Sequence, residues 1–501
     1  MVRRILLAFC LMAALPAAGW SQTLRIALRE DPDLLDPTLA RSYVGRIVFA
    51  GLCDKLFDLN EKLDIVSGLA VSHAWADPVT LILHLRPGVT FHNGEPVDAA
   101  AVKYTLERHL TMAGSFRRSE IASVDRIEIV DPLTAKIVLK SPTAPLLAQL
   151  TDRAGMILPP KATEAAGKDF ARAPVCSGPF KFAERVAQDR IVLDRFPEYW
   201  DKAAVHFDRV IYQPMPDSTV LLANLRSGTV DLAERVLPTD IAQVKADPKL
   251  RIVTSPALGY EGITFNVGNG ERAKSPIGQN RLLRQAFDAA IDRQALVDVV
   301  FNGMYTPTAQ AVSAASPFYV GAVPAPPRDL ARARKLIKDG GVSTPVAAQM
   351  NVPNTPDRAQ AAEVIQSMVK EAGFELKINL IEFAASLQAG TRGEFESWLI
   401  GWSGRADPDG NLFSFLTTGG GQNDGHYSQL GVDKALVDGR QSNDIAARRA
   451  AYTAALIQIR EDMPLIYLFS PVNVVGMSAK LTGFRPVPDG MIRLQGMAMA
   501  K

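Results

Sequence analysis

The stretch around residues 80–108 limits the fold more than any other part of the chain, because it specifies a strand, two turns and a helix in close succession. Apolar residues recur at every second position, as in a strand with one buried face, and Asp98 stands where it can cap the helix that follows. The recurring residues are Leu81, Leu83 and Leu85, and the turn sequences are Pro87-Gly88 and Asn93-Gly94. The stretch carries no catalytic motif, which favours binding over chemistry.

The two halves of the chain have different patterns. Up to about residue 265, short strand-like runs alternate with turns, which predicts mixed sheets. Further along, apolar residues at helical spacing predict helices over 282–291 and 357–372, and strand-like runs follow at 377–381 and 398–402. We therefore expect an α/β fold with mixed sheets, in two or three domains.

The first residues have the layout of a secretory signal peptide. Arg3 and Arg4 precede an apolar run, and small residues follow it up to Ser21, so we expect residues 1–21 to be removed on export. Cys10 is a poor candidate for lipid attachment because Phe9 stands where a small residue is needed. No second apolar run reaches the length of about 20 residues that a membrane helix needs, so we expect a protein released into the periplasm without a membrane anchor.

The charge balance argues against two classes of partner. Loss of the leader lowers the Lys+Arg total from 55 to 53, which equals the 53 Asp+Glu residues. Nucleic acids and anionic membranes are bound through clustered positive charge, so neither is expected as a partner.

Two cysteines, Cys53 and Cys176, remain after the leader. An oxidising compartment permits a disulfide between them, and two buried free thiols are the alternative. The sequence alone leaves both open.

The chain resembles the extracellular solute-binding proteins of family 5, the peptide-binding and nickel-binding proteins that serve ABC importers. The opening stretch contains the family's Arg-x-Gly-Val-x-Phe-His-x-Gly run. Five further motifs stand in family order: Asp36-Pro37, Ser177-Gly178-Pro179-Phe180, Phe265-Asn266, the 284–293 run and Gly401-Trp402. The resemblance covers nearly all of the chain after the leader.

The resemblance implies a two-lobed periplasmic binding protein of type II, with a double-crossover hinge near residues 266 and 470. The first lobe would comprise residues 22–265 and 475–501, with an extra subdomain at about 61–174. The second lobe would comprise residues 266–474. Such a protein closes on its ligand and strips water from it, so a charged ligand must meet opposite charge or strong donors in the cleft.

The segment 401–410 is the strongest candidate for ligand contact, because a strand leads there into glycine-rich backbone that carries Trp402, Arg405 and Asp407. In peptide-binding relatives an acidic residue pairs with the peptide amino group. In this chain Arg405 stands at about that place, and Asp407 is a nearby substitute if the alignment contains a one-residue gap. The dipeptide-binding relatives also use an arginine to hold the peptide carboxylate, and Asn354 stands at its place here. A cleft with these residues would bind a free zwitterionic dipeptide poorly, and it would better suit an anionic ligand bound by Arg405. Alternatively, Arg405 pairs with Asp407 or Asp409 and shapes the loop.

Weaker candidates for ligand contact are Ser42, Tyr43, Asn266 and Tyr427. Ser42 and Tyr43 face the cleft in the family. Asn266 lies at the first crossover, where its amide either touches ligand or holds hinge backbone. Tyr427 follows a glycine-rich stretch.

We therefore expect a monomeric solute-binding protein, without cofactor or metal ligands, that carries a peptide-like or anionic small solute to an inner-membrane ABC permease. A binder of a metal chelate or of an opine-type solute is the alternative. An exported serine hydrolase is a distant one, because Ser367-Met-Val-Lys370 fits Ser-x-x-Lys but lacks the accompanying motifs.

Overall fold

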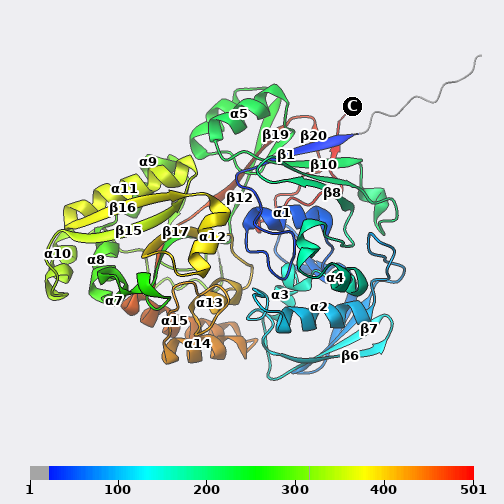
Figure 1. The fold of residues 1–501 in the computed structure, drawn as a ribbon, viewed down its shortest axis with the longest axis horizontal. Helices are drawn as coiled ribbons and strands as arrows, with labels where there is room; N and C mark the ends of the chain where they lie inside the picture. Colours follow the sequence, from blue (N-terminus) through cyan, green and yellow to red (C-terminus); the bar gives the residue numbers. More distant parts are fainter. Residues whose placement is uncertain (1–21, 315, 501) are drawn as a thin grey trace, which may run out of the picture.

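The computed structural model describes residues 22–314 and 316–500, and the predicted signal peptide lies outside the described residues. Three sheets dominate the fold (Figure 1): one of seven strands, one of six and one of four. The first two are mixed sheets with helices packed on them, so the predicted α/β class with mixed sheets is confirmed.

The seven-stranded sheet is the core of the first lobe and has the strand order β12-β19-β11-β1-β10-β9-β8. β1 runs parallel to β10 and β11, and the other pairs are antiparallel. Its strands are β1 (Thr23–Leu28), β8 (Phe180–Val186), β9 (Arg190–Arg195), β10 (Arg209–Pro214), β11 (Leu232–Ala233), β12 (Leu250–Pro256) and β19 (Val472–Ser478).

Two helices cover opposite faces of this sheet. Leu24 and Ile26 of β1 pack in one apolar cluster with α1 (Tyr43–Leu52), whereas Ala27 packs in another with α5 (Ser218–Ser227). Successive side chains of a strand point to opposite faces, so one strand contributes to both clusters. Cys53, the residue after α1, is joined to Cys176 by a disulfide, with a Cα–Cα distance of 4.9 Å.

The four-stranded antiparallel sheet, with strand order β4-β5-β7-β6, forms the subdomain of the first lobe, at the lower right of Figure 1. Its strand β5 ends at Leu85 and Asp98 caps α2 by accepting the amide of Ala101 at 2.9 Å, both as predicted. The elements are β4 (Ala70–Asp77), β5 (Thr80–Leu85), β6 (Val124–Asp131), β7 (Thr134–Leu139) and α2 (Ala99–Thr111).

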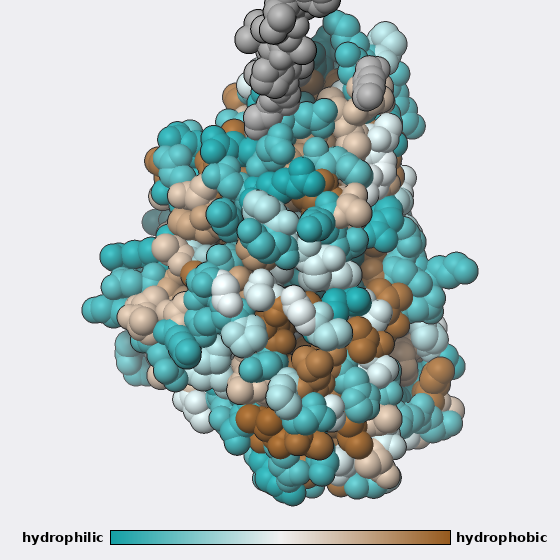
Figure 2. Space-filling view, turned by 90° about the vertical axis from the view of Figure 1, so that its right-hand side faces the viewer, coloured by the Kyte–Doolittle hydropathy of each residue, from teal (hydrophilic) through white to brown (hydrophobic). Residues whose placement is uncertain are grey.

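The face of the molecule in Figure 2 shows a group of apolar side chains on the lower half. The exposed large apolar residues of the four-stranded sheet include Val71 and Trp75 of β4 and Ile129 and Val130 of β6. These residues lie on β4 and β6, the two edge strands.

The six-stranded sheet is the core of the second lobe, with strand order β14-β18-β13-β17-β15-β16. The predicted helices and strands of this half are present, with ends shifted by at most a few residues. The strands are β13 (Tyr260–Phe265), β14 (Thr306–Pro307), β15 (Val346–Pro353), β16 (Phe374–Ile381), β17 (Ser397–Trp402) and β18 (Leu465–Ser470). The helices are α7 (Pro276–Gln279), α8 (Arg281–Ala290), α9 (Arg293–Phe301), α10 (Leu330–Asp339), α11 (Pro356–Ala372), α12 (Phe383–Thr391), α13 (Asp409–Leu416), α14 (Leu430–Arg440) and α15 (Ile445–Asp462).

Short elements complete both lobes. They are β2 (Phe57–Leu59), β3 (Ile65–Ser67), α3 (Leu146–Gln149), α4 (Pro160–Ala166), α6 (Ile241–Lys245), β20 (Leu481–Thr482) and β21 (Ala498–Met499). Within the described residues no helix is both long enough and apolar enough to span a bilayer.

The chain passes between the two large sheets twice, at residues 257–259 and at Pro471. The sequence-based boundary at 265/266 puts β13 in the first lobe, but its hydrogen bonds join it to β17 and β18 of the second sheet. The boundary at 474/475 likewise cuts β19, which pairs with β12 of the first sheet. Strand periodicity does not reveal which sheet a buried strand joins, because every buried strand has the same apolar pattern.

Candidate functional site

A cavity lies between the two lobes and encloses about 1020 Å³ of space free of protein atoms, part of it open to solvent. Both lobes contribute polar and aromatic side chains to its wall. The first lobe supplies, among others, Arg29, Glu30, Arg41, Ser42, Tyr43 and Arg235, and the second lobe supplies Glu261, Arg358, Trp398, Trp402, Gln422 and Asp424.

The parallel pairing of the first sheet places two of these arginines. β1 ends at Leu28 and β11 ends at Ala233, and the two strands run in the same direction side by side. Arg29 follows the first strand directly, and Arg235 follows the second after one residue. The carboxyl ends of neighbouring parallel strands are a common position for ligand-binding residues in α/β proteins.

Ion pairs connect the lobes around the cavity. Arg29 of the first lobe donates to both carboxylate oxygens of Asp357 in α11 at 3.0 Å. Arg358, the next residue, donates to Glu261 at 2.9 Å and to Glu30 of the opposite lobe. Burial raises the pKa of Asp357, but the charges of Arg29 and Arg358 outweigh this effect and hold that pKa well below its ordinary value. The carboxylates in the cavity wall are therefore already paired with arginines.

A third pair acts in the same way at the edge of the cavity. Arg41 of the first lobe donates to Asp424 and to Gln422 of the second, the latter at 2.9 Å. In total, four arginines and three carboxylates line the cavity, an excess of one positive charge.

Several nitrogen donors of the wall have no acceptor. Arg29 Nε, Trp398 Nε1 and Gln422 Nε2 are buried without a hydrogen-bond partner in the part of the chain that the structure describes. A buried polar group without a partner costs about 1–3 kcal/mol, so these donors are suited to acceptors that arrive with a ligand. The arrangement can therefore bind a solute rich in carboxylate or carbonyl oxygens.

Three of the predicted site residues line this cavity. Ser42 caps α1 and donates its hydroxyl to Asp33 at 2.6 Å, and Tyr43 donates its hydroxyl to the carbonyl of Gly490 at 2.9 Å. Trp402 ends β17 and donates its indole N–H to Asn411 at 3.0 Å. Because their polar atoms are already bonded, these residues offer the cavity mainly aromatic and aliphatic surface.

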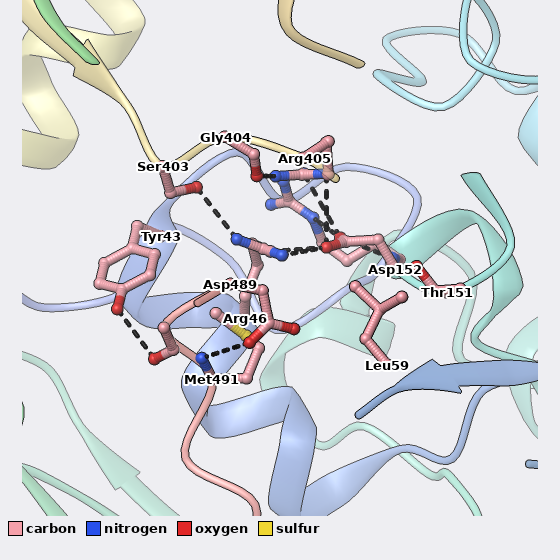
Figure 3. A network of polar contacts seen from close by, with 12 residues as sticks. Tyr43, Arg46, Leu59, Thr151, Asp152, Ser403, Gly404, Arg405, Asp489 and Met491 are labelled. Atoms are coloured by element: carbon pink, nitrogen blue, oxygen red, sulfur yellow. Dashed lines mark hydrogen bonds and ion pairs between the residues drawn. The ribbon is translucent and has the colours of Figure 1, made fainter. Parts of the chain in front are cut away.

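Arg405 lies behind the wall rather than among the residues that line it. Its guanidinium stacks over the Trp402 ring at 4.4 Å. It also reaches Asp152 of the first lobe at 3.4 Å (Figure 3). Arg46 binds the same carboxylate at 2.7 Å and also donates to Ser403 at 3.0 Å. The charged partner of Arg405 is thus a residue of the opposite lobe, not Asp407 or Asp409, and the carbonyl of Gly404 in its own loop accepts from the same guanidinium at 2.8 Å.

Charge and burial act together at this contact. Burial and the neighbouring Arg46 lower the pKa of Arg405 to about 9. Burial raises the pKa of Asp152, but Arg405, Arg46 and Arg153 outweigh it and hold that pKa well below its ordinary value. Asp152 is therefore ionised and serves as the shared acceptor of several arginines.

The remaining predicted residues do not line the main cavity. Asp407 binds Arg448 at 2.7 Å. Asn266 follows β13 and so lies within the second lobe, not at the crossover where it was predicted, and it donates to the backbone carbonyls of Asn269, Gly393 and Phe395. Asn354 is exposed after β15, and Tyr427 donates to Asp462 at 2.6 Å beside a smaller cavity. Their roles in binding stay predictions, as does the role of Arg405.

Arg29, Arg235 and Arg358 were not predicted as site residues from the sequence. A signal was present for the first two, because each arginine stands directly after, or one residue beyond, a short apolar strand. Ser367 and Lys370 of the Ser-x-x-Lys match are exposed on α11 and do not line the cavity. Within residues 22–314 and 316–500, no group of three or more His, Cys, Asp or Glu residues is arranged to hold a metal ion.

Comparisons with known proteins agree with this architecture. The family described as bacterial extracellular solute-binding proteins, family 5, matches residues 64–424. A glutathione-binding protein of Pectobacterium atrosepticum is 28% identical over 92% of this chain and 91% of its own length. Its counterpart in Salmonella typhimurium is 29% identical over 95% of this chain and 94% of its own.

Solved structures show the same fold. A periplasmic binding protein from Agrobacterium tumefaciens in complex with agropinic acid superposes with a TM-score of 0.87 at 25% identity, covering 96% of this chain and 99% of that one. The murein tripeptide-binding protein of Escherichia coli gives a TM-score of 0.89 at 21% identity, with the same coverage of 96% and 99%. The chain therefore belongs to family 5 of the bacterial extracellular solute-binding proteins, which bind small solutes and work with ABC permeases.

Proposed function

We propose that this chain is an exported periplasmic receptor for a small peptide-like solute with more carboxylates than amines, which it binds between its lobes and releases unaltered to an inner-membrane permease. Glutathione, the ligand named for the relatives that match most of the chain, is the first candidate. Residues 1–21 would supply the export signal. The relatives are binding proteins, which supports a receptor rather than an enzyme.

The observation that carries this proposal is the charge and bonding state of the cavity wall. Four arginines face three carboxylates there, and the wall's buried groups without partners are nitrogen donors. The wall carboxylates of Glu30, Glu261 and Asp424 each accept from an arginine already. A ligand with net negative charge is favoured, because its carboxylates would meet N–H donors while its single amine would need only one acceptor.

Three predicted residues support the same site. Ser42, Tyr43 and Trp402 line the cavity and would contact the ligand directly. Arg405 and Asp407 would act from behind it, because each is bonded to a protein partner that fixes the loop between β17 and α13. Asn266 would hold the backbone that follows β13 against the backbone that precedes β17.

An opine-type solute is the second candidate. The superposable structure at 25% identity holds agropinic acid, which is also an acid, and the same unpaired donors would accept its oxygens. A metal held by a carboxylate-bearing chelator would use the same donors and remains the alternative predicted from the sequence.

The test is a titration of the protein lacking residues 1–21 with glutathione, agropinic acid and the zwitterionic dipeptide alanylalanine. We expect calorimetry to show one site per chain for one of the two acids and much weaker binding of the dipeptide. At about 100 times its dissociation constant, the bound acid should raise the unfolding free energy by about 2.7 kcal/mol. Mass spectrometry should recover the ligand unchanged. Tighter binding of alanylalanine, or a chemically altered ligand, would contradict the proposal.

A further inference from the structure

We infer that Arg235, supported by the ring of Tyr43, is the residue that binds a carboxylate of the ligand on the first-lobe wall. The inference rests on the proposed function and deepens it, because it assigns the ligand's charge to one side chain. It also differs from the expectation of the sequence, in which Arg405 of the opposite lobe had this role.

The first argument is bonding. Of the four arginines that line the cavity, Arg235 is the one whose guanidinium makes no hydrogen bond to another described residue. Arg29, Arg41 and Arg358 each donate to at least one carboxylate. A planar guanidinium offers two parallel N–H groups to a carboxylate, and in Arg235 this arrangement is unused.

The second argument is access. The side chain of Arg235 is 19% exposed, against 9% for Arg29, 8% for Arg41 and 10% for Arg358. These small values follow from the pairing of the other three arginines within the wall. Arg235 therefore has the largest surface among them for contact with a ligand.

The third argument is position. The guanidinium carbon of Arg235 lies 5.7 Å from the centre of the Tyr43 ring, within the range of a cation–π contact. The ring itself is fixed because its hydroxyl donates to the carbonyl of Gly490 at 2.9 Å. A fixed ring beneath a long side chain reduces the conformational freedom that binding must remove, so the cation is held in place before the ligand arrives.

A competing role for Arg235 is to neutralise Glu234. That carboxylate is buried and lies 3.6 Å from Arg235 Nε, and one of its oxygens accepts no hydrogen bond from a described residue. Burial raises the pKa of Glu234, and Arg235 and Arg29 oppose that rise. The contact is longer than a hydrogen bond, so it leaves the fork of Arg235 free for a ligand.

The experiment compares Arg235→Gln and Arg235→Lys with the wild-type protein, using glutathione and its diethyl ester as probes. Arg226→Gln is the matched control, because Arg226 is exposed on α5 of the same lobe and does not line the cavity. We expect Arg235→Gln to weaken glutathione binding about 30-fold or more and ester binding less than about threefold. Lysine should restore part of the loss, because it keeps the charge without the fork.

A second variant separates ligand binding from neutralisation of Glu234. If Arg235 serves only Glu234, the double variant Glu234→Gln/Arg235→Gln should recover both stability and glutathione affinity. Under our inference it recovers stability at most, and glutathione stays weakly bound. Equal losses for glutathione and its ester, or full recovery in the double variant, would overturn the inference while the proposed function stands. If the wild-type protein binds neither glutathione nor any other acid of the panel, both fail together.

Discussion

Arg405 and Arg235 stand on opposite sides of one cleft and differ in what their guanidinium groups already contact. Arg405 reaches Asp152 across the lobes and stacks on Trp402. Arg235 lines the cavity and makes no hydrogen bond to a described residue. The contrast teaches that an arginine in a cleft binds ligand only if the protein leaves its N–H donors unused. An arginine whose acceptor belongs to the other lobe instead favours the closure of the two lobes.

The largest expected effect comes from the acceptor of Arg405. Asp152→Asn removes a buried charge that Arg46 and Arg405 share, and leaves both guanidinium groups without that charged partner. We expect the free energy of unfolding to fall by about 3–5 kcal/mol, measured by urea denaturation followed by circular dichroism.

The matched control for that variant is Asp169→Asn, whose carboxylate forms an exposed ion pair with Arg172. Its effect should stay within about 0.5 kcal/mol. If Asp152→Asn is as mild as this control, the Arg405 region is not a buried charge cluster, and the contrast with Arg235 disappears.

A pH titration of stability tests whether the difference between Arg405 and Arg235 depends on the protonation of other groups. His92 is one of several buried groups that contribute to the pH dependence of stability. Burial raises the pKa of Asp54 to about 7 and lowers that of His109 well below its ordinary value. Burial lowers the pKa of His92 to about 4 despite its hydrogen bond to the carbonyl of Gly178. Its folded pKa lies below its unfolded value of about 6.5, so its contribution to stability is complete above pH 6.5 and is lost as the pH falls toward 4. We expect this contribution to fall by about 2–3 kcal/mol over that range, measured as the difference in unfolding free energy between the wild type and His92→Gln.

In the variant His92→Gln this contribution to the pH dependence of stability should be absent. Both arginines keep their charge between pH 4 and 7, so the ratio of glutathione affinities of the wild type and Arg235→Gln should not follow that dependence. A ratio that changes in parallel with stability would show that the Arg235 effect is indirect.

The smallest expected effect is that of Arg405→Gln on affinity. The variant weakens a contact between the lobes without removing a ligand contact, so glutathione and its diethyl ester should lose affinity by the same factor, about tenfold or 1.4 kcal/mol. Arg392→Gln, in an exposed pair with Glu394 of the same lobe, is the control and should leave both affinities unchanged. A loss of affinity for glutathione but not for its ester would show that Arg405 binds a carboxylate of the ligand.

The local structure of the chain follows closely from sequence. The alternating leucines before Leu85, the cap at Asp98 and the helix over 281–290 were each predicted from a pattern of a few neighbouring residues. The segment 401–410 was identified because Trp402, at the end of β17, and Arg405 stand close together there, and Trp402 does line the cavity. Arg235 was not identified, because an arginine after a two-residue strand gives a weak local signal.

The sequence by itself determined the helices and strands, the α/β class and the family, because these depend on apolar spacing, turn residues and short motifs within the reach of neighbouring residues. Only the tertiary structure decided which charges are paired. Arg405 and Asp152 are 253 residues apart, and Arg29 and Asp357 are 328 apart, so no local pattern connects them. Ion pairing depends on distance in space, and the packing of the two lobes sets that distance.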